Sequence, residues 1–355
     1  MNSRLLKLRA QFDALKIDAF LVTFLPHIRY LSGFSGSNAI CIVTRSSQTI
    51  LSDGRYTDQI RSEVKEWDVF ITKTDLLDEM RKRKLLPRGT RLGFDGNSVH
   101  FSQYQEMKKL FPSVKFLPKA DCLERIAAVK DAGEVEKIEK AVEISDAVFS
   151  ELLPLITSGI AELDLAAEIS YRQRKHGAEA DAFETIVASG ERSALPHGKA
   201  SSKKIQNGEF VTLDFGAVYE GYHSDLTRTV AVGKIPAEGK KIYSTVHDAQ
   251  QKAIDAAKSG MKARDLDAVA RRHIRKLGYE KFFRHSLGHG IGLQIHEPPR
   301  ISVLSKAVLE EGNVITIEPG IYVPGFGGVR IEDDIHITDA GIQVLNRSPK
   351  ELLIL

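Results

Sequence analysis

Cysteine is scarce in this sequence, and long apolar runs are missing from it. The two cysteines, Cys41 and Cys122, form neither a CxxC pair nor a disulfide framework, so we expect a reduced, cytoplasmic protein. No stretch approaches the ~18 consecutive apolar residues that cross a bilayer, which argues against a transmembrane helix. The first residues, MNSRLLKLRAQFDALK, carry charges every few positions and lack the apolar segment of a signal peptide.

An excess of charge of either sign is also missing. The 50 Lys and Arg residues against 47 Asp and Glu residues give a net charge of +3, and the basic residues are spread along the chain. We therefore expect neither a nucleic acid nor a membrane as partner. A composition of 42% hydrophobic and 27% charged residues is typical of a globular protein, and 355 residues are enough for two domains.

Residues 1–122 predict a small α/β domain. Short apolar strand candidates such as AICIVT, TILSD and DVFITK alternate with helix candidates such as TDQIRSEVKE and SQYQEMKKLF. Alternation of this kind is typical of a sheet covered by helices. We find no cluster of reactive side chains in this part of the sequence.

The pattern changes after residue 122, where we place the domain boundary. A long helix is predicted from about Asp131 to Leu153, with apolar residues spaced for one buried stripe. Three more helices are expected, over about 162–176, 239–258 and 264–277. A strand-rich and glycine-rich final third follows, so we expect residues 123–355 to form a larger α+β domain.

The stretch from Val211 to Val230, VTLDFGAVYEGYHSDLTRTV, holds two alternating apolar runs that each carry one aspartate. A turn at Tyr219–Glu220 places Asp225 opposite Asp214. A turn shifted by one position, to Glu220–Gly221, leaves the two aspartates diagonal but on the same face. In both registers the carboxylates lie within roughly 4.5–8 Å of each other and repel unless a cation lies between them. The alternative is a pair of solvated aspartates on an exposed strand face.

Three later stretches also place polar residues in apolar strands: HSLGHGIGLQIHEPPR, NVITIEPGIY and GVRIEDDIHIT. In the last of them, alternation puts Arg330, Glu332 and Asp334 on one face of a strand. A lone histidine or a lone strand-end glutamate in such a run is usually structural or exposed. The candidate residues in the other two stretches are His285, His289, His296 and Glu318.

Taken together, Asp214, Asp225, Glu318 and Glu332 are four carboxylates in segments apolar enough to be buried. Burying four unpaired negative charges would be prohibitive, whereas two divalent cations would balance them charge for charge. Oxygen ligands with one imidazole suit Mn²⁺, Co²⁺, Fe²⁺ or Zn²⁺ better than they suit a thiolate zinc site. A pair of such ions would activate water and polarise a carbonyl, which is the chemistry of amide hydrolysis.

At these positions the sequence resembles the pita-bread metallopeptidases, which include methionine aminopeptidase, aminopeptidase P and prolidase. The order DFG…SDLTRT, GHGIG, IEPG and RIED fills all five of the family's metal-ligand positions. By that resemblance, the ligands are Asp214, Asp225, His289, Glu318 and Glu332, and Asp225 and Glu332 bridge two ions. The resemblance implies Mn or Co in preference to Zn or Fe, and a pita-bread fold for the second domain.

The first domain resembles the creatinase-like N-terminal domain of the Xaa-Pro peptidases in YLSGFSGSNA and LSDGRYTDQ. His197 in LPHGK and His296 in HEPPR also match that branch. The resemblance implies that both histidines contact the substrate carbonyl and stabilise the oxyanion. It further implies that Glu318 carries a proton from water to the leaving nitrogen.

Four further residues complete the expected site. Arg330 is expected to orient the carboxylates. Arg300 either holds a substrate carboxylate, which would favour dipeptides, or is a surface arginine after a turn. By alternation His223 lies on the face of Asp225 and borders the site, and His285 is interpreted as structural or as a support for the ligands.

The resemblance implies an enzyme that acts on small peptides with proline in the second position, as a homodimer. The SGFSGS and DGRY features favour an aminopeptidase P, which cleaves longer peptides, and a prolidase, which cleaves Xaa-Pro dipeptides, is the alternative. Two other hypotheses are a non-catalytic peptide-binding protein on the same scaffold and creatinase-type C–N hydrolysis. Both are disfavoured because all five ligand positions are filled.

Overall fold

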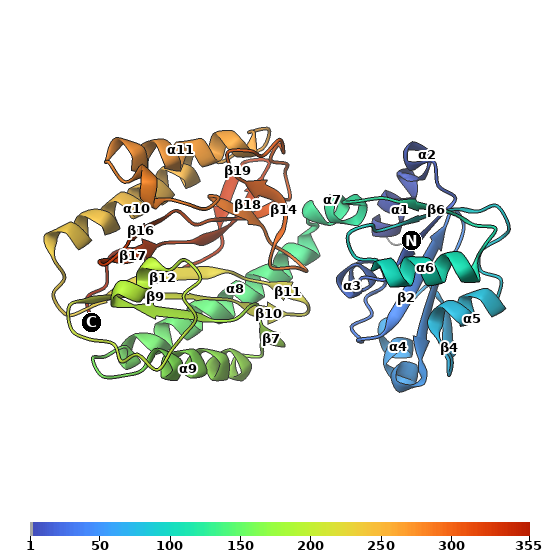
Figure 1. Ribbon diagram of the computed structural model, residues 1–355, viewed down its shortest axis with the longest axis horizontal. Coiled ribbons are helices and arrows are strands. Elements are labelled where there is room, and N and C mark those ends of the chain that lie inside the picture. Colours follow the sequence, from blue (N-terminus) through green and yellow to red (C-terminus); the bar gives the residue numbers. More distant parts are fainter. Residues whose placement is uncertain (1–2) are drawn as a thin grey trace. The chain divides into compact units, whose positions relative to one another are not determined.

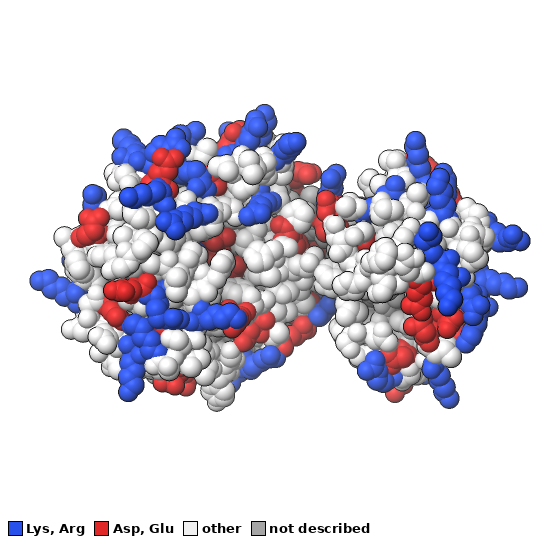
Figure 2. Space-filling model, in the orientation of Figure 1, with Lys and Arg blue, Asp and Glu red and all other residues white. Residues whose placement is uncertain are grey.

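The computed structural model describes residues 3–355, and the chain divides into two compact units (Figure 1). One unit extends to Ala127 and the other runs from Ala128 to Leu355, whereas the sequence places the boundary after residue 122. Each unit has its own sheets and its own apolar core. Figure 2 shows basic and acidic side chains interspersed over the visible face of each unit, in keeping with the net charge of +3.

The first unit contains one six-stranded sheet with the strand order β4-β3-β2-β1-β5-β6. Its strands are β1 (Ala19–Val22), β2 (Ala39–Thr44), β3 (Gln48–Asp53), β4 (Asp68–Thr72), β5 (Arg91–Phe94) and β6 (Lys115–Pro118). Its helices are α1 (Ser3–Ala10), α2 (Phe12–Leu15), α3 (Leu25–Ser32), α4 (Thr57–Glu63), α5 (Leu76–Lys82) and α6 (Phe101–Leu110), and α7 (Cys122–Ala128) ends at the boundary. Leu21, Ile42 and Leu92 of the sheet share a core with Met80 and Met107 of the helices, so the alternation in the sequence produces the expected helix-covered sheet.

The four main helices of the second unit confirm the helices predicted from periodicity. They are α8 (Ala132–Leu152), α9 (Glu162–Lys175), α10 (Ala237–Ala256) and α11 (Ala263–Lys276). Helix α8 begins at a capping box, in which Asp131 accepts from the backbone N–H of Glu134 and the Glu134 side chain accepts from that of Asp131. Of the helices within residues 3–355, none is both long enough and apolar enough to span a membrane.

The strands of the second unit lie between two helix layers, with α10 and α11 on one side and α8 and α9 on the other (Figure 1). The strands are β7 (Ala180–Asp181), β8 (Ile186–Ser189), β9 (Glu209–Phe215), β10 (Ala217–Tyr219), β11 (Tyr222–His223), β12 (Leu226–Val232), β13 (Gly288–Gly290), β14 (Glu297–Ile301), β15 (Val314–Ile317), β16 (Gly320–Val323), β17 (Gly327–Arg330), β18 (Asp333–Thr338) and β19 (Gly341–Val344). They form sheets ordered β11-β10-β7, β12-β9-β8, β14-β13-β15-β18-β19 and β16-β17.

The aspartate hairpin adopts the second of the two registers considered from the sequence. Tyr219 pairs with Tyr222, so the turn lies at Glu220–Gly221, where both residues have positive φ angles of 45° and 83°. Farther along the hairpin, Asp214 pairs with Thr227. Asp225 precedes Thr227 by two positions and is therefore diagonal to Asp214, which keeps both carboxylates on one face.

The RIEDD segment is divided between two strands, whereas the sequence predicted one alternating strand. Strand β17 ends at Arg330 and β18 begins at Asp333. Between them, the backbone N–H of Glu332 donates to the carbonyl of Thr227 at 3.1 Å. The chain thus pairs with β12 as it passes from one sheet to the next, and this crossing places Glu332 beside the aspartate hairpin.

Candidate metal centre and active site

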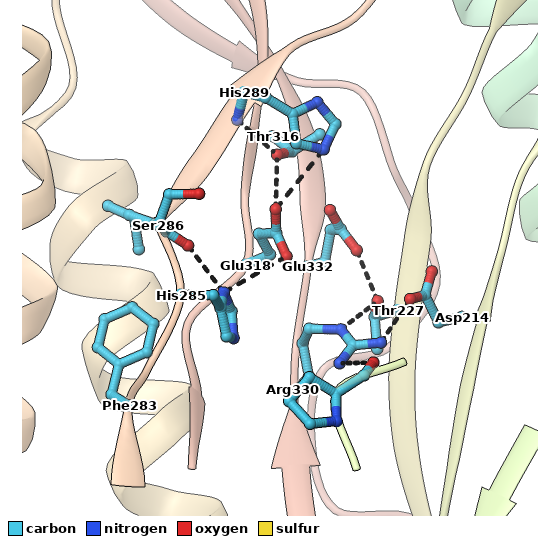
Figure 3. A network of polar contacts seen from close by, with 12 residues as sticks. Asp214, Thr227, Phe283, His285, Ser286, His289, Thr316, Glu318, Arg330 and Glu332 are labelled. Carbon is cyan, nitrogen blue, oxygen red and sulfur yellow. Dashed lines mark hydrogen bonds and ion pairs between the residues drawn. The ribbon is translucent and has the colours of Figure 1, made fainter. Parts of the chain in front are cut away.

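Strand ends bring together the five residues that the sequence nominates as metal ligands. Asp214 lies in β9, Asp225 just before β12, His289 in β13, Glu318 just after β15 and Glu332 just before β18. The pairing of Ile317 with Asp333 puts Glu318 and Glu332 at neighbouring ends of two hydrogen-bonded strands. Figure 3 shows these two carboxylates close together, with His289 beyond them and Asp214 to the side of Glu332.

Distances between side-chain atoms define a compact cluster. Ligand atoms of Asp225, His289 and Glu332 all lie within 4.8 Å of one another. Nε2 of His289 lies 3.6 Å from Oδ2 of Asp225 and 3.6 Å from Oε1 of Glu318. Asp214 and Glu332 are joined through their neighbours, since Arg330 binds Asp214 and also contacts Thr227, which in turn binds Glu332. The five residues therefore surround one small volume.

Burial sets the charge states in this cluster. Burial and the neighbouring Glu332 carboxylate raise the pKa of Asp225 well above its usual range. Burial, together with Asp214, raises the pKa of Glu332 to about 8. Burial and the nearby His296 lower the pKa of His289 to about 4, so its imidazole is neutral at pH 7. Buried carboxylates with raised pKa values beside a neutral imidazole mark this cluster as a candidate cation site.

The donor set fits a pair of divalent metal ions. Within the described chain, Asp214 Oδ1, Asp225 Oδ1 and Glu332 Oε1 are buried and have no hydrogen-bond partner. Buried polar atoms are normally paired, because leaving one unsatisfied costs free energy. Carboxylate oxygens and a neutral imidazole nitrogen are the ligands that Mn²⁺, Co²⁺, Zn²⁺ and Fe²⁺ take in proteins. Four carboxylates would balance the charge of two such ions.

Arg330, which the sequence predicts to be an orienting residue, contacts Asp214 directly and Glu332 through Thr227. Its buried guanidinium binds Oδ2 of Asp214, and its Nη1 donates to the hydroxyl of Tyr322 at 2.7 Å and to the carbonyl of Pro196 at 3.1 Å. Its Nε donates to Oγ1 of Thr227 at 3.1 Å. A planar group with fixed donors restricts the position of each partner.

Thr227 and Tyr322 are site residues that the sequence reasoning missed. The hydroxyl of Thr227 donates to Oε2 of Glu332 at 2.5 Å, which leaves the other carboxylate oxygen free for a metal ion. The hydroxyl of Tyr322 lies 3.0 Å from Nε2 of His285. Both residues stand in motifs already singled out, SDLTRT and IEPGIY, so alternation within those motifs was the available signal.

His285, interpreted from the sequence as structural or as a support for the ligands, lies beside the cluster. Its Nδ1 is 2.8 Å from the carbonyl of Ser286 and 3.9 Å from Oε2 of Glu318. Burial and the charge of Arg330 lower the pKa of His285 to about 3, so the ring stays neutral. A neutral ring placed between Tyr322 and Glu318 adds no charge to the cluster.

The cluster opens into a cavity of about 630 Å³. Its lining includes the metal-ligand candidates together with His197, His296 and Arg300. The ring of His296 lies 4.4 Å from that of His289, measured between centroids. His197, His296 and Arg300 are exposed, unlike the buried carboxylates, so they form the accessible part of the cavity wall.

His223 contacts the backbone of a neighbouring loop and is not among the residues that line the cavity. Its backbone N–H and its Nδ1 both donate to the carbonyl of Gly292, at 2.8 and 3.0 Å. Gly292 belongs to the loop that leads to His296. His223 therefore fixes that loop, whereas the sequence suggested only that it borders the site.

A buried ion pair, also missed from the sequence, holds the same loop from its other end. Nζ of Lys130 lies 2.9 Å from Oε2 of Glu297, and the two side chains are only 1% and 5% exposed. The other oxygen of Glu297 accepts from the backbone N–H of Gln294 at 2.9 Å. Glu297 directly follows His296, so the pair fixes the backbone from which that imidazole extends.

The carboxylates and the imidazole that line this cavity form a candidate site for catalytic metal ions. Residues 136–339 match Metallopeptidase family M24, and residues 4–129 match the Creatinase/Prolidase N-terminal domain. The chain belongs to metallopeptidase family M24. These matches confirm the resemblance and the α+β fold class inferred from the sequence, and they make the chain a metallopeptidase.

Individual relatives are similar over the whole chain. The Xaa-Pro dipeptidase of Pyrococcus horikoshii is 40% identical over 356 residues, which cover 99% of each sequence. The structure of an Xaa-Pro dipeptidase from Bacillus anthracis superposes with a TM-score of 0.96 at 40% identity, covering 99% of both chains. An X-Pro aminopeptidase from Thermotoga maritima gives a TM-score of 0.91 at 39% identity, covering 98% of this chain and 100% of that one.

The raised carboxyl pKa values predict how the stability of the metal-free protein depends on pH. Folding raises the pKa of Glu332 from 4.5 to about 8, so between these values the folded state holds a proton that the unfolded chain has released. The free energy of unfolding therefore falls as the pH rises through this window. His289 and His285 act in the opposite direction, but only below their ordinary pKa of 6.5.

We expect the Tm of chelator-treated protein to fall by about 5 °C between pH 6.5 and 8.5. Thermal unfolding followed by circular dichroism at both pH values measures the change. Saturating Mn²⁺ should abolish this fall in Tm, because metal binding displaces the proton from Glu332. Without metal, Glu332→Gln should reduce the dependence of Tm on pH. A pH dependence that this substitution leaves unchanged would show that another group titrates.

Proposed function

We propose that this metallopeptidase hydrolyses Xaa-Pro dipeptides with two divalent metal ions. The observation that carries the proposal is the convergence of Asp214, Asp225, His289, Glu318 and Glu332 on one cavity, with buried carboxylate oxygens left for a ligand. The sequence favoured an aminopeptidase P, with the dipeptidase as the alternative. The names of the Pyrococcus and Bacillus anthracis relatives support the alternative better.

The residues that line the cavity have different proposed roles. Two bound metal ions would supply activated water and a polarised substrate carbonyl. His197 and His296 would donate hydrogen bonds to the carbonyl oxygen as it gains negative charge. Burial and the neighbouring Glu332 raise the pKa of Glu318, which suits its carboxyl to accept a proton and pass it to the proline nitrogen that leaves.

Arg300 provides the proposed basis for selecting dipeptides. Its exposed side chain lines the same cavity as His296, four positions earlier in the chain. A dipeptide places its terminal carboxylate one residue beyond the scissile bond, and a guanidinium binds a carboxylate through paired hydrogen bonds. A longer peptide has a neutral amide there and gains less from the arginine.

Metal identity, assembly and location complete the proposal. The carboxylate oxygens and the imidazole of the cluster suit all four ions, and Mn²⁺ or Co²⁺ is preferred to Zn²⁺ or Fe²⁺ by resemblance to the family. We further propose a homodimer, by resemblance to the Xaa-Pro peptidases. The small number of cysteines supports a cytoplasmic location.

Substrate length provides the test. For enzyme loaded with Mn²⁺ or Co²⁺, kcat/KM for Ala-Pro should exceed that for Ala-Pro-Gly by about 10-fold or more, and Ala-Ala should be cleaved poorly. Arg300→Gln should raise KM for the dipeptide and narrow this ratio. A higher kcat/KM for the tripeptide would support the aminopeptidase reading, and absence of Xaa-Pro cleavage by metal-loaded enzyme would contradict both.

A further inference from the structure

His197 stands on a loop that has little regular structure to hold it. The loop leaves β8 at Ser189, forms a short 3₁₀ helix over Gly190–Ala194, and continues past His197 to Ser201. His197 itself is exposed at the cavity. An exposed side chain on a connecting segment needs external contacts to stay in one position.

A single buried carboxylate makes those contacts at both ends of the loop. Glu162, the first residue of α9, is 0% exposed. Its Oε1 accepts from the backbone N–H and the hydroxyl of Ser189 at 2.8 and 2.9 Å. Its Oε2 accepts from the backbone N–H and the hydroxyl of Ser201 at 3.1 and 2.7 Å. One side chain thus joins two residues that are twelve positions apart and flank His197.

Arg192, which lies within the loop, is a further hydrogen-bond donor to this carboxylate. Its Nε lies 3.1 Å from Oε2 of Glu162, and its Nη2 donates to the carbonyl of Lys199 at 2.5 Å. The backbone also contributes, because the N–H of Leu163 donates to the carbonyl of Ser201 at 3.0 Å. A buried anion with this many donors is well satisfied, and its removal would leave several of them unpaired.

The far side of the loop touches the residues that organise the metal centre. The carbonyl of Pro196, directly before His197, accepts from Nη1 of Arg330 at 3.1 Å. The hydroxyl of Ser193 accepts from the backbone N–H of Gly328 at 2.8 Å. The loop is therefore held between Glu162 at its base and strand β17 at the cavity.

We propose that Glu162 is a positioning residue for His197: it closes the base of the 190–201 loop and so fixes the imidazole over the cavity. Its part in turnover rests on the role proposed for His197 above. Glu162 touches neither the cavity nor the metal-ligand cluster, so it acts only through the loop. Both carboxylate oxygens are needed, because each binds a different end.

Glu162→Gln tests the proposal with little change of shape. The amide places an N–H₂ donor where a carboxylate oxygen accepted hydrogen bonds from the loop. Those hydrogen bonds are lost, so one end of the loop is released. Hydrogen exchange followed by mass spectrometry should be about 10-fold faster over residues 190–201. Glu168→Gln is the matched control, because Glu168 lies on the same helix, is half-exposed and pairs with Arg172.

Kinetics separate positioning from a general effect on the fold. In metal-loaded enzyme, Glu162→Gln should lower kcat for Ala-Pro by about 30-fold with two metal ions retained. Added to His197→Ala, the same substitution should lower kcat by less than about 3-fold, because the group it positions is already gone. Glu168→Gln should leave kcat unchanged in both backgrounds.

Two outcomes would overturn the inference. Unchanged exchange over 190–201 in the Glu162→Gln variant would show that the carboxylate does not close the loop. Equal losses of kcat in the wild-type and His197→Ala backgrounds would show that Glu162 acts on the fold as a whole. Failure of wild-type enzyme to cleave Xaa-Pro peptides would contradict the proposed function instead, and the exchange measurement would still decide whether the loop is closed.

Discussion

Replacing Asp225 with asparagine, or Glu332 with glutamine, is expected to remove both metal ions and to lower kcat/KM by about 10⁴-fold. The two side chains are 5% and 2% exposed, and each has one buried oxygen without a hydrogen-bond partner in the described chain. Each replacement keeps the size of the side chain and removes its charge. Metal content measured by mass spectrometry after dialysis, together with Ala-Pro hydrolysis, gives both readouts on the same samples.

The stability of these variants distinguishes loss of metal from loss of fold. Burial and the neighbouring carboxylates raise the pKa of Asp225, so the ionised group is unfavourable in the metal-free protein. Metal-free Asp225→Asn should therefore have a higher Tm than metal-free wild type at pH 8. Asp265→Asn is the control for the effect of an Asp-to-Asn substitution on Tm, because Asp265 is exposed and pairs with Arg264. A metal-loaded, fully active Asp225→Asn enzyme would rule out a bridging role.

The second large effect concerns the cavity histidines, whose removal should separate catalysis from metal binding. His197→Ala or His296→Ala should each lower kcat by about 10²–10³-fold, the usual loss when one donor to an oxyanion is removed. Both side chains lie on the exposed wall of the cavity rather than in the buried cluster, so two metal ions should remain bound. Steady-state kinetics and metal analysis test the two halves of this expectation.

His247→Ala is the matched control for the histidine variants, because His247 lies on α10 beside Asp248 and away from the cavity. It should leave kcat and KM unchanged. Loss of metal from His197→Ala would place that side chain among the ligands. An unchanged kcat in either variant would show that the replaced histidine takes no part in the proposed chemistry.

Local periodicity in the sequence was sufficient to predict the helices and the aspartate hairpin. The apolar stripe predicted a helix from about Asp131 to Leu153, and α8 runs from Ala132 to Leu152. Gly221 identified the turn region, and a two-residue period then left two registers, both of which keep Asp214 and Asp225 on one face. These features depend on neighbours within a few positions, and such neighbours are visible in one sequence.

The supporting contacts depend on residues that are far apart in the chain, and no local pattern marks them. Thr227 and Glu332 are 105 positions apart, and Lys130 and Glu297 are 167 apart. Glu162 stands in the first turn of a helix, where acidic residues are common. Only the fold reveals that its side chain is buried and joins two ends of a loop.

The division of the RIEDD segment has a similar explanation. Alternation placed Arg330, Glu332 and Asp334 on one face of one strand, whereas the chain changes sheets between Arg330 and Asp333. The partner of Glu332 in this crossing is Thr227, in another sheet. A sequence pattern records which residues are apolar, but it does not record which strand supplies the next hydrogen bond.

The guanidinium of Arg330 has a consequence for how ligands influence each other. One planar group holds Asp214 on the metal side and the carbonyl of Pro196 on the side of the histidine loop. A peptide that displaces the loop therefore alters the electrostatic environment of Asp214. If a metal ion binds at Asp214, thermodynamic reciprocity requires that it bias the loop by the same free energy, and substrate affinity and metal retention would then be linked quantities.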